Sequence, residues 1–360
     1  METKSKDNTL QPMSFFKEIP QDQHLNGKAS AISHRLTLRD HLGSFKARWS
    51  IGRMRYTVTP GIYALGTPNS ESMVMVTSNY KMSVDRLRSA LPGIDCWILV
   101  LDTKGINVWC AAGKGTFGTE ELLNRIRLTG LGRIVSHRRL ILPQLSAPGV
   151  AAHEVKKSSG FSVRYGPIKA KDIIPFINAG LKATPEMRLK TFHLWERIVL
   201  IPVELVTALK WFLLIMAAFI IVEGFSGPET FWTNALTNGL FAAFALMGAL
   251  AAGAVMTPIL LPWIPGRPFS VKGALSGVFV FFLLLTYRGV DLITWPGRME
   301  MAGWLFMISA VSAFLGMNFT GASTYTSLSG VKKEMKWAIP IEISATAIGL
   351  FLWLGSKWIR

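Results

Sequence analysis

The sequence is short of cysteine and of acidic residues, and both shortages limit what the protein can be. Two cysteines among 360 residues, Cys96 and Cys110, are too few for a disulfide framework or a cysteine-rich metal site. Only 22 aspartates and glutamates balance 39 lysines and arginines, which leaves a formal charge of +17 at pH 7. Such a charge favours binding to nucleic acid or to an anionic membrane surface.

Nucleic acid is the weaker of these two partners. The sequence contains no zinc finger, no RNP motif and no basic region followed by heptads, which are modules that read nucleic acid. The first 200 residues hold 29 of the basic and 15 of the acidic residues, and the rest of the chain is mostly apolar. We therefore expect a polar, irregular N-terminal lead-in over residues 1–50, a cytoplasmic domain over 51–197 and a transmembrane domain over 198–360.

Five apolar stretches in the second half are long enough to predict membrane-spanning helices. The expected spans are Leu200–Val222, Ala235–Leu261, Gly273–Tyr287, Gly303–Met317 and Ala338–Leu354. The short loops on the side of the first domain carry slightly more lysine and arginine than those on the other side, which favours a cytoplasmic location for that domain. The sequence thus predicts a multi-pass protein of the cell membrane.

Polar side chains inside these spans are of interest, because such residues often mark a functional site. They include Glu204, Lys210, Asn238 and Glu342. Glu204 lies near the end of its span, and the long Lys210 side chain can reach the interface. The remaining polar residues are few for a charged transport path.

The domain before the spans alternates short apolar runs with helical patterns. The runs "SMVMVTSN" and "DCWILVLDT" are typical of buried strands, and "GTEELLNRIRLTG" has the acidic first turn and closing glycine of a helix. This alternation predicts an α/β fold, a Rossmann-like doubly wound parallel sheet with helices on both faces. Ligands of such sheets bind at the carboxyl ends of the strands, so the loop after "WILVLDT" is a candidate site.

The stretch "NVWCAAGK", Asn107 to Lys114, follows that loop. Asn107 is a good N-cap, which places Cys110 in the first turn of a short helix, where peptide dipoles favour a thiolate. Lys114 lies one turn later on the same face, and the small residues between them leave that face bare for a large flat group. The pattern is compatible with a cysteine that ligates the metal of a planar cofactor and with a buried structural cysteine. For Cys96, on a strand without a neighbouring cysteine, we expect core packing.

"NVWCAAGK" resembles the cap-helix motif of the mercury-methylating corrinoid proteins, the HgcA family. The segment from about Arg55 to Val203 is similar to the corrinoid-binding domain of the corrinoid iron–sulfur protein of the acetyl-CoA pathway. The stretch "NFTGASTYTSLSGVKKEM", from Asn318 to Met335, resembles the membrane part of the mercury-methylating family.

The resemblance implies a cobalamin-type corrinoid, bound base-off, with Cys110 as the lower axial ligand of its cobalt. The residues that would form the surface beneath the corrin are Asn107, Val108, Trp109, Cys110, Ala111, Ala112, Gly113 and Lys114. Strand-end loops supply weaker candidates for the other edge of the corrin, near Thr59, Ser136, Gln144 and Tyr165.

The activity implied by the resemblance is that of a corrinoid-dependent methyltransferase. It would pass a methyl group from methyl-cobalt(III) to Hg(II) and release methylmercury, with Cys110 as the catalytic residue. The implied partners are HgcB, a ferredoxin-like reductant with two [4Fe–4S] clusters, and a methyltetrahydrofolate-dependent methyltransferase as the methyl source. Two alternatives stay open: a membrane-anchored corrinoid methyl carrier for another acceptor in one-carbon and acetyl-CoA metabolism, and a non-enzymatic transporter or thiol sensor.

Overall fold

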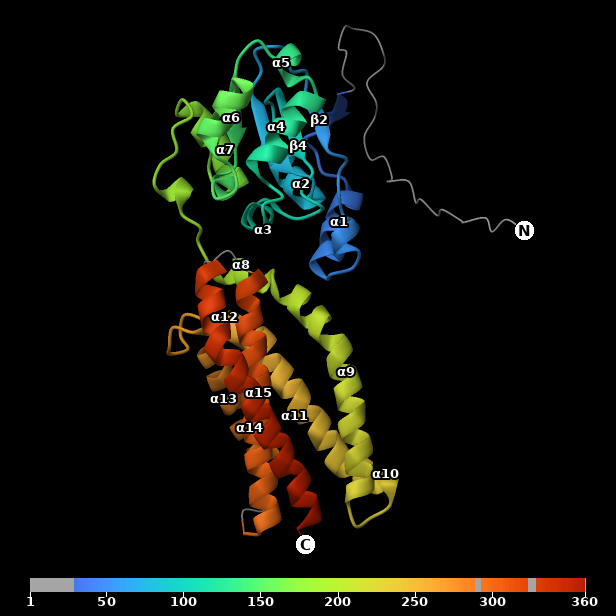
Figure 1. The fold of residues 1–360 in the computed structure, drawn as a ribbon. Helices are drawn as coiled ribbons and strands as arrows, with labels where there is room; N and C mark the ends of the chain where they lie inside the picture. The colour runs from blue at the N-terminus through green and yellow to red at the C-terminus, as the bar shows by residue number, and fades with distance from the viewer. Residues whose placement is uncertain (1–28, 289–292, 323–327, 360) are drawn as a thin grey trace, which may run out of the picture. The chain divides into compact units, whose positions relative to one another are not determined.

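The computed structural model describes residues 29–288, 293–322 and 328–359. Most of the expected N-terminal lead-in, residues 1–28, and part of the motif after Asn318 lie outside the described residues. The chain forms two compact units (Figure 1). The first contains Gly52–Lys190 and the described residues before Arg48, and the second contains Arg48–Ile51 and the residues from Thr191 on. The first unit contains a β-sheet with helices, and the second contains long apolar helices.

Within the described residues, six strands form one sheet in the order β1-β2-β4-β3-β5-β6. Their bounds are β1 Ser30–Ile32, β2 Gly61–Leu65, β3 Val74–Ser78, β4 Cys96–Leu101, β5 Arg139–Leu142 and β6 Ser162–Tyr165. The central strands β3 and β4 are buried along their whole length, as expected for apolar runs covered on both faces. The predicted α/β sheet is confirmed.

One feature of the sheet differs from the expected parallel arrangement. β2 pairs antiparallel with β4, with Tyr63 opposite Ile98, whereas the other neighbouring pairs are parallel. The connection from β2 to β3 explains the direction of β2. Parallel strands need a crossover of a dozen or more residues, but only residues 66–73 separate Leu65 from Val74. β2 therefore ends at the same edge of the sheet at which β3 begins.

Helices cover both faces of this sheet. Their bounds are α1 Leu38–Arg48, α2 Lys81–Ser89, α3 Val108–Lys114, α4 Thr119–Leu128, α5 Leu131–Ile134, α6 Ala152–Ser159 and α7 Ile173–Asn178. Alternate residues of β4 face opposite sides: Leu99 packs in the core under α3, α4 and α6, and Ile98 in the core under α2 and α7. The period of two along a buried strand thus produces two apolar cores.

The described part of the lead-in is structured, contrary to the expectation of an irregular segment before residue 51. It contributes β1 and α1, and a buried cluster of charges ties α1 to α2. Lys81 Nζ lies 2.5 Å from Asp40 and 2.7 Å from Asp85, and Arg88 lies 2.8 Å from each of the same carboxylates. All four side chains are at most 8% exposed, so the cluster is both buried and electrically balanced.

The second unit is a bundle of helices (Figure 1). Its elements are α8 Leu194–Ile198, α9 Ile201–Ser226, α10 Phe231–Asn234, α11 Leu240–Ala251, α12 Thr257–Leu260, α13 Phe269–Arg288, α14 Trp295–Ala322 and α15 Leu328–Trp358. Two π-helical segments, Ala235–Gly239 and Ala252–Met256, connect α10, α11 and α12 into one continuous helical stretch.

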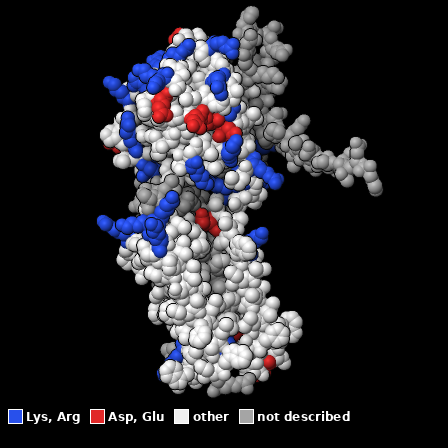
Figure 2. All heavy atoms as spheres, viewed as in Figure 1, with Lys and Arg blue, Asp and Glu red and all other residues white. Residues whose placement is uncertain are grey.

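Within the described residues of this unit, five stretches are long and apolar enough to cross a membrane, and each overlaps one predicted span. They are Leu194–Ser226, Phe231–Leu260, Phe269–Thr286, Trp295–Phe319 and Gly330–Trp358. On the face that Figure 2 shows, this unit is largely free of charged side chains between its two ends. Both observations indicate a membrane protein. The cytoplasmic side of the first unit stays a prediction from the loop charges.

Small residues allow the long helices to pack closely. A Cβ added to Gly303 of α14 would lie 2.8 Å from the Gly349 carbonyl oxygen of α15. One added to Gly273 of α13 would lie 2.4 Å from the Ser312 carbonyl oxygen of α14. Close backbone approach at small residues is the usual basis of helix association in a membrane, where apolar burial drives little.

Candidate functional site

The loop from β4 to α3 lies at the carboxyl end of the central strands and is fixed from the neighbouring strand. Asn79, directly after β3, accepts hydrogen bonds on its side-chain oxygen from the Thr103 N–H at 3.1 Å, the Thr103 hydroxyl at 2.8 Å and the Gly105 N–H at 3.0 Å. Asn79 and Thr103 are both buried, so these donors need that oxygen as their partner. Sequence reasoning missed Asn79, although an asparagine that ends a buried strand is a signal of this role.

α3 begins as the sequence predicts. The Asn107 side-chain oxygen accepts the Cys110 N–H at 3.0 Å, which confirms the predicted N-cap. Gly115 closes the helix with a φ of 82°, in the left-handed region that glycine tolerates best. Cys110 therefore lies in the first turn of a helix capped at both ends, and it is partly exposed.

The inner face of α3 contradicts one expectation about the alanines of the motif. Ala111 and Ala112 are 0% and 5% exposed and belong to the core beside Phe117, so they do not share a bare outer face with Cys110. Successive residues of an α-helix are turned by about 100°, which points these two inward. Their small size admits the Gly149 backbone, where an added Cβ would lie 3.0 Å from the Ala112 Cα. Their role beneath the corrin stays a prediction.

The outer face of α3 is formed by Cys110, Gly113 and Lys114, at positions i, i+3 and i+4. Gly113 and Lys114 are exposed, and Val108 and Trp109 are partly exposed beside them. Among the described residues, no hydrogen bond to the Cys110 sulfur is found. Because Gly113 has no side chain, a flat group can approach the backbone next to that sulfur. The residues present thus fit a planar cofactor whose metal accepts one sulfur ligand.

The other cysteine is confirmed as a core residue. Cys96 is 0% exposed at the start of β4, packed in the apolar core under α2 and α7. Burial, with a smaller effect of the nearby Asp95 charge, raises the pKa of the Cys96 thiol to about 12. Cys96 is therefore a thiol at neutral pH and is not accessible to a ligand.

The structure places the weaker candidates at strand ends on two opposite edges of the sheet. Thr59 precedes the antiparallel β2, Gln144 follows β5 and Tyr165 ends β6, so all three lie at the edge of the sheet where α3 begins. Ser136 precedes the parallel strand β5 and lies at the opposite edge, where its N–H donates to the Ser70 carbonyl at 2.9 Å. The expectation for Ser136 was wrong because it took no account of the end of the strand to which the residue belongs.

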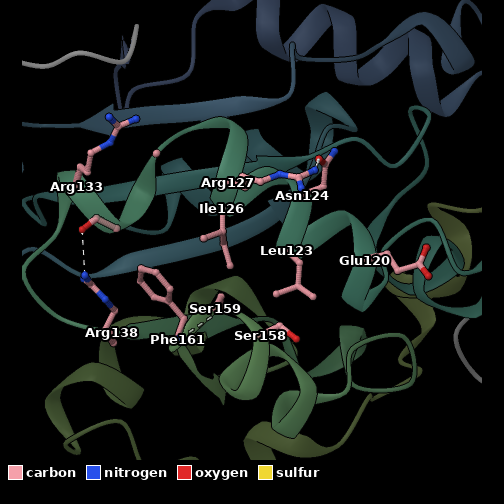
Figure 3. Close-up of a pocket in the computed structure, with 12 residues that line it drawn as sticks. Glu120, Leu123, Asn124, Ile126, Arg127, Arg133, Arg138, Ser158, Ser159 and Phe161 are labelled. Atoms are coloured by element: carbon pink, nitrogen blue, oxygen red, sulfur yellow. Dashed lines mark hydrogen bonds between the residues drawn. The ribbon is translucent and has the colours of Figure 1, made fainter.

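A hollow of about 720 Å³ in the first unit lies apart from α3, between α4, α5 and the end of α6 (Figure 3). Two of the arginines that line it interact with neighbouring residues of the same unit. Arg127 donates to the Asn124 side chain at 3.0 Å, and Arg138 donates to the Gly132 carbonyl at 3.1 Å and lies over the Phe161 ring. No residue of α3 lines this hollow, so it is not part of the candidate site.

Comparison with known proteins gives matches to the unit that carries this site. Residues 50–177 match the family described as CO dehydrogenase/acetyl-CoA synthase delta subunit. The matched segment contains β2 to β6 and the whole of α3. It ends before the helices that are long and apolar enough to cross a membrane.

Curated relatives match part of the chain as well, and each is named acetyl-CoA decarbonylase/synthase complex subunit gamma. The protein of Methanopyrus kandleri is 31% identical over 122 residues, which are 33% of this chain and 26% of that protein. That of Methanocaldococcus jannaschii is 34% identical over 97 residues, 26% of this chain and 20% of that protein. That of Archaeoglobus fulgidus is 31% identical over 113 residues, 31% of this chain and 24% of that protein. The chain thus spans about a quarter of the length of these relatives.

These matches support the predicted similarity of the first unit to proteins of the acetyl-CoA pathway. The names of the relatives refer to acetyl-CoA and not to mercury. Of the functions that the sequence suggested, the names therefore agree better with a methyl carrier of one-carbon and acetyl-CoA metabolism than with mercury methylation.

Proposed function

We propose that the first unit binds a corrinoid against α3, with Cys110 as the lower ligand of the cobalt, and that the protein is a membrane-bound corrinoid-dependent methyltransferase. The observation that carries this proposal is the partly exposed Cys110 beside the bare Gly113, on a capped helix at the carboxyl edge of the sheet. The relatives are named as subunits of an acetyl-CoA decarbonylase/synthase complex, which supports a role in one-carbon chemistry.

Each residue of α3 has a distinct part in this proposal. When bound, the corrinoid supplies a cobalt that can carry a methyl group. Asn107 fixes the first turn and thus the position of the Cys110 sulfur. Gly113 lets the ring approach the helix backbone, and Lys114 places a positive charge one turn from the sulfur. Ala111 and Ala112 hold the helix on the core from below.

The methyl acceptor that we propose is Hg(II), with methylmercury as the product. This finer assignment depends on the resemblance of "NVWCAAGK" to the mercury-methylating family and on the membrane-spanning helices, which the family match does not cover. The second candidate is methyl transfer to an acceptor of acetyl-CoA metabolism, and the names of the relatives favour it. Both candidates share the same corrinoid site, so they differ only in the acceptor.

The proposal requires other proteins to reduce the cobalt and to supply the methyl group. The two cysteines are fewer than the four that a [4Fe–4S] cluster uses, so reduction of the cobalt needs another protein. We assign this part to HgcB, the ferredoxin-like protein with two such clusters that the resemblance implies. A methyltetrahydrofolate-dependent methyltransferase is the proposed methyl source.

The deciding experiment measures methylmercury from Hg(II) under anaerobic conditions, in membranes that contain the protein, HgcB and a methyl source. We expect product from the wild type and a loss of at least roughly a hundredfold for Cys110→Ala, because the variant removes the one cysteine sulfur that is not buried. Cys96→Ala is the matched control, since it removes the other thiol from the core and is expected to keep activity.

A second assay separates the acceptors. The same membranes are loaded with a labelled methyl-corrinoid and offered either Hg(II) or a nickel-containing acetyl-CoA synthase with carbon monoxide and coenzyme A. If the label moves only to acetyl-CoA, the acceptor belongs to acetyl-CoA metabolism and not to mercury methylation, and the proposed corrinoid site still holds. Wild-type protein that retains no corrinoid at all would refute both.

A further inference from the structure

The second unit contains a cavity that has no part in the proposed methyl transfer. It has a volume of about 700 Å³ and lies between α9, α14 and α15. Each helix lines it with one stripe: Thr207, Ala208 and Trp211 are on that of α9, and Ala347 and Leu350 are on that of α15. The lining is mainly apolar, and all three helices belong to predicted membrane spans.

Two carboxylates interrupt this apolar lining. Glu204 contributes from the first turn of α9, and Glu342 from α15, and no lysine or arginine is among the described residues that line the cavity. Glu342 is 7% exposed, and both of its carboxylate oxygens lack a hydrogen-bond partner within the described structure. The nearby Thr346 hydroxyl donates to the Glu342 main-chain carbonyl at 2.8 Å and so does not satisfy the carboxylate. A buried carboxylate without a partner is unfavourable unless it is neutralised or a ligand supplies donors.

The opposite end of α9 shows how such a carboxylate is satisfied when the protein provides the partners. Glu223, near the end of α9, is 1% exposed, accepts the Trp353 indole N–H at 2.9 Å and pairs with Lys357 at 2.9 Å. A hydrogen bond and an ion pair therefore connect α9 to α15 at this end. Near the other end of α9 the cavity lies between the two helices, and no lysine or arginine is among the described residues that line it beside Glu342.

The size of the cavity limits what can fill it. A volume of about 700 Å³ is within the range of small-molecule sites. A partner helix of 20 residues, about 30 Å long and 10 Å wide, would need roughly 2,400 Å³ and does not fit. A flexible acyl chain does fit an apolar cavity of this size, and its head group would have to meet the carboxylates.

The position along the helix agrees with a lipid head group. Glu342 follows Lys336 by six residues, about 9 Å along the axis of α15, which is roughly the depth of the interfacial region. Lys332, Lys333 and Lys336 are exposed on the turns before it and carry the charge that attracts a phosphate. A zwitterionic lipid with a primary ammonium offers a phosphate at the level of the lysines and N–H donors at the level of Glu342.

We propose that this cavity binds an aminophospholipid of the phosphatidylethanolamine type, with its ammonium against Glu342 and Glu204 and an acyl chain between α9, α14 and α15. The N–H donors of the ammonium satisfy the two carboxylate oxygens of Glu342, which have no hydrogen-bond partner within the described structure. A quaternary choline head has the same charge but no N–H donor, so the site discriminates between the two lipids.

The test uses the full chain in detergent micelles with phosphatidylethanolamine or phosphatidylcholine of identical acyl chains, and native mass spectrometry counts the retained lipid. We expect roughly tenfold preferential retention of phosphatidylethanolamine by the wild type, the effect of one charge-assisted hydrogen bond. Glu342→Gln should bring the two lipids to equal retention. Glu229→Gln, which removes an exposed carboxylate elsewhere in the second unit, should keep the preference.

A second variant tests the cavity without touching the carboxylate. Ala347→Trp fills the apolar part from an exposed position on α15 and should reduce retention of both lipids at unchanged helical content by circular dichroism. Equal retention by the wild type, a preference that survives Glu342→Gln, or a preference for anionic phosphatidylglycerol would each overturn the proposal. None of these readouts depends on corrinoid or on methyl transfer.

Discussion

The two cysteines occupy opposite environments, and their reactivity should differ accordingly. Cys96 is fully buried in β4, and burial raises the pKa of its thiol to about 12. Cys110 is partly exposed at the start of α3. Alkylation requires an accessible sulfur in the thiolate form. Cys110 is accessible, whereas below pH 12 the Cys96 sulfur is neither accessible nor ionised.

We therefore predict that iodoacetamide modifies one cysteine in the native, corrinoid-free protein at neutral pH and both after denaturation. Peptide mass spectrometry would assign the native modification to Cys110. The Cys110→Ala variant should remain unmodified until it unfolds. Native labelling of Cys96 would contradict the burial that the structure shows for β4.

The N-cap of α3 gives a second prediction at the scale of single residues. Asn107→Ala removes the acceptor of the Cys110 N–H and should destabilise the first turn by about 1 kcal/mol. If the corrinoid binds to the intact helix, its dissociation constant should rise about fivefold. Spectroscopic titration of the full chain with corrinoid measures this change.

Asn107→Ser is the matched control, because a serine hydroxyl also caps a helix and should keep binding near the wild-type value. Equal affinity of Asn107→Ala and wild type would mean that the order of the first turn does not contribute to binding.

At the same scale, the sequence predicted the cap better than it predicted the faces of α3. Asn107 could be recognised because capping is local and depends on residue type. The inward direction of Ala111 and Ala112 depends on which side of a seven-residue helix rests on the core, and contacts with Phe117 and Gly149 decide that. Asn79 acts on the loop from another strand, so its role appears only once β3 and β4 are paired.

At the scale of elements, α1 is attached by charges that no local pattern could reveal. Asp40 lies far in sequence from Lys81 and Arg88, and only the fold brings them together. Burial by itself would raise the pKa of Asp40, but hydrogen bonds from Lys81 and Thr37 hold that pKa well below its usual range. A depressed carboxyl pKa adds stability above the unfolded-state value near 3.8, and this stability is lost as the pH falls below it.

Asp40→Asn should therefore destabilise the first unit by about 3 kcal/mol at neutral pH, because it leaves buried cations without their partner. Urea unfolding of the full chain, followed by a probe in the first unit, measures the loss. Asp102→Asn breaks the exposed pair with Lys104 and should cost much less, because water screens that pair. The difference between the two variants should shrink as the pH is lowered below about 4. Similar costs for both at neutral pH would argue against a buried network.

The elements themselves were predictable where one pattern dominates. Long apolar stretches identified five spans, and buried runs identified β3 and β4, because hydrophobic burial decides both. β1 has only three residues and gives no periodic signal. The direction of β2 follows from the short connection to β3, which is a property of topology and not of the strand.

At the scale of the whole molecule, the family match and the candidate membrane spans divide the chain in nearly the same way as its two compact units. Residues 50–177 match proteins named for acetyl-CoA chemistry, and the predicted spans begin after Lys190. The segment between the end of the family match and the first candidate span contains two exposed basic residues, Lys182 and Arg188, at which trypsin can cleave. This feature allows the orientation of the protein in the membrane to be tested.

We predict that trypsin releases the first unit from inside-out membrane vesicles and leaves it intact on sealed right-side-out vesicles, because the basic loops favour a cytoplasmic location. Immunoblotting of the supernatant for a first-unit epitope measures the release. Detergent-opened right-side-out vesicles are the control and should release the same fragment. Release from the intact right-side-out vesicles alone would place the first unit outside the cell. Cys110 would then be separated from the cytoplasmic methyl donor and reductant proposed here, and the methyl-transfer proposal could not hold in its present form.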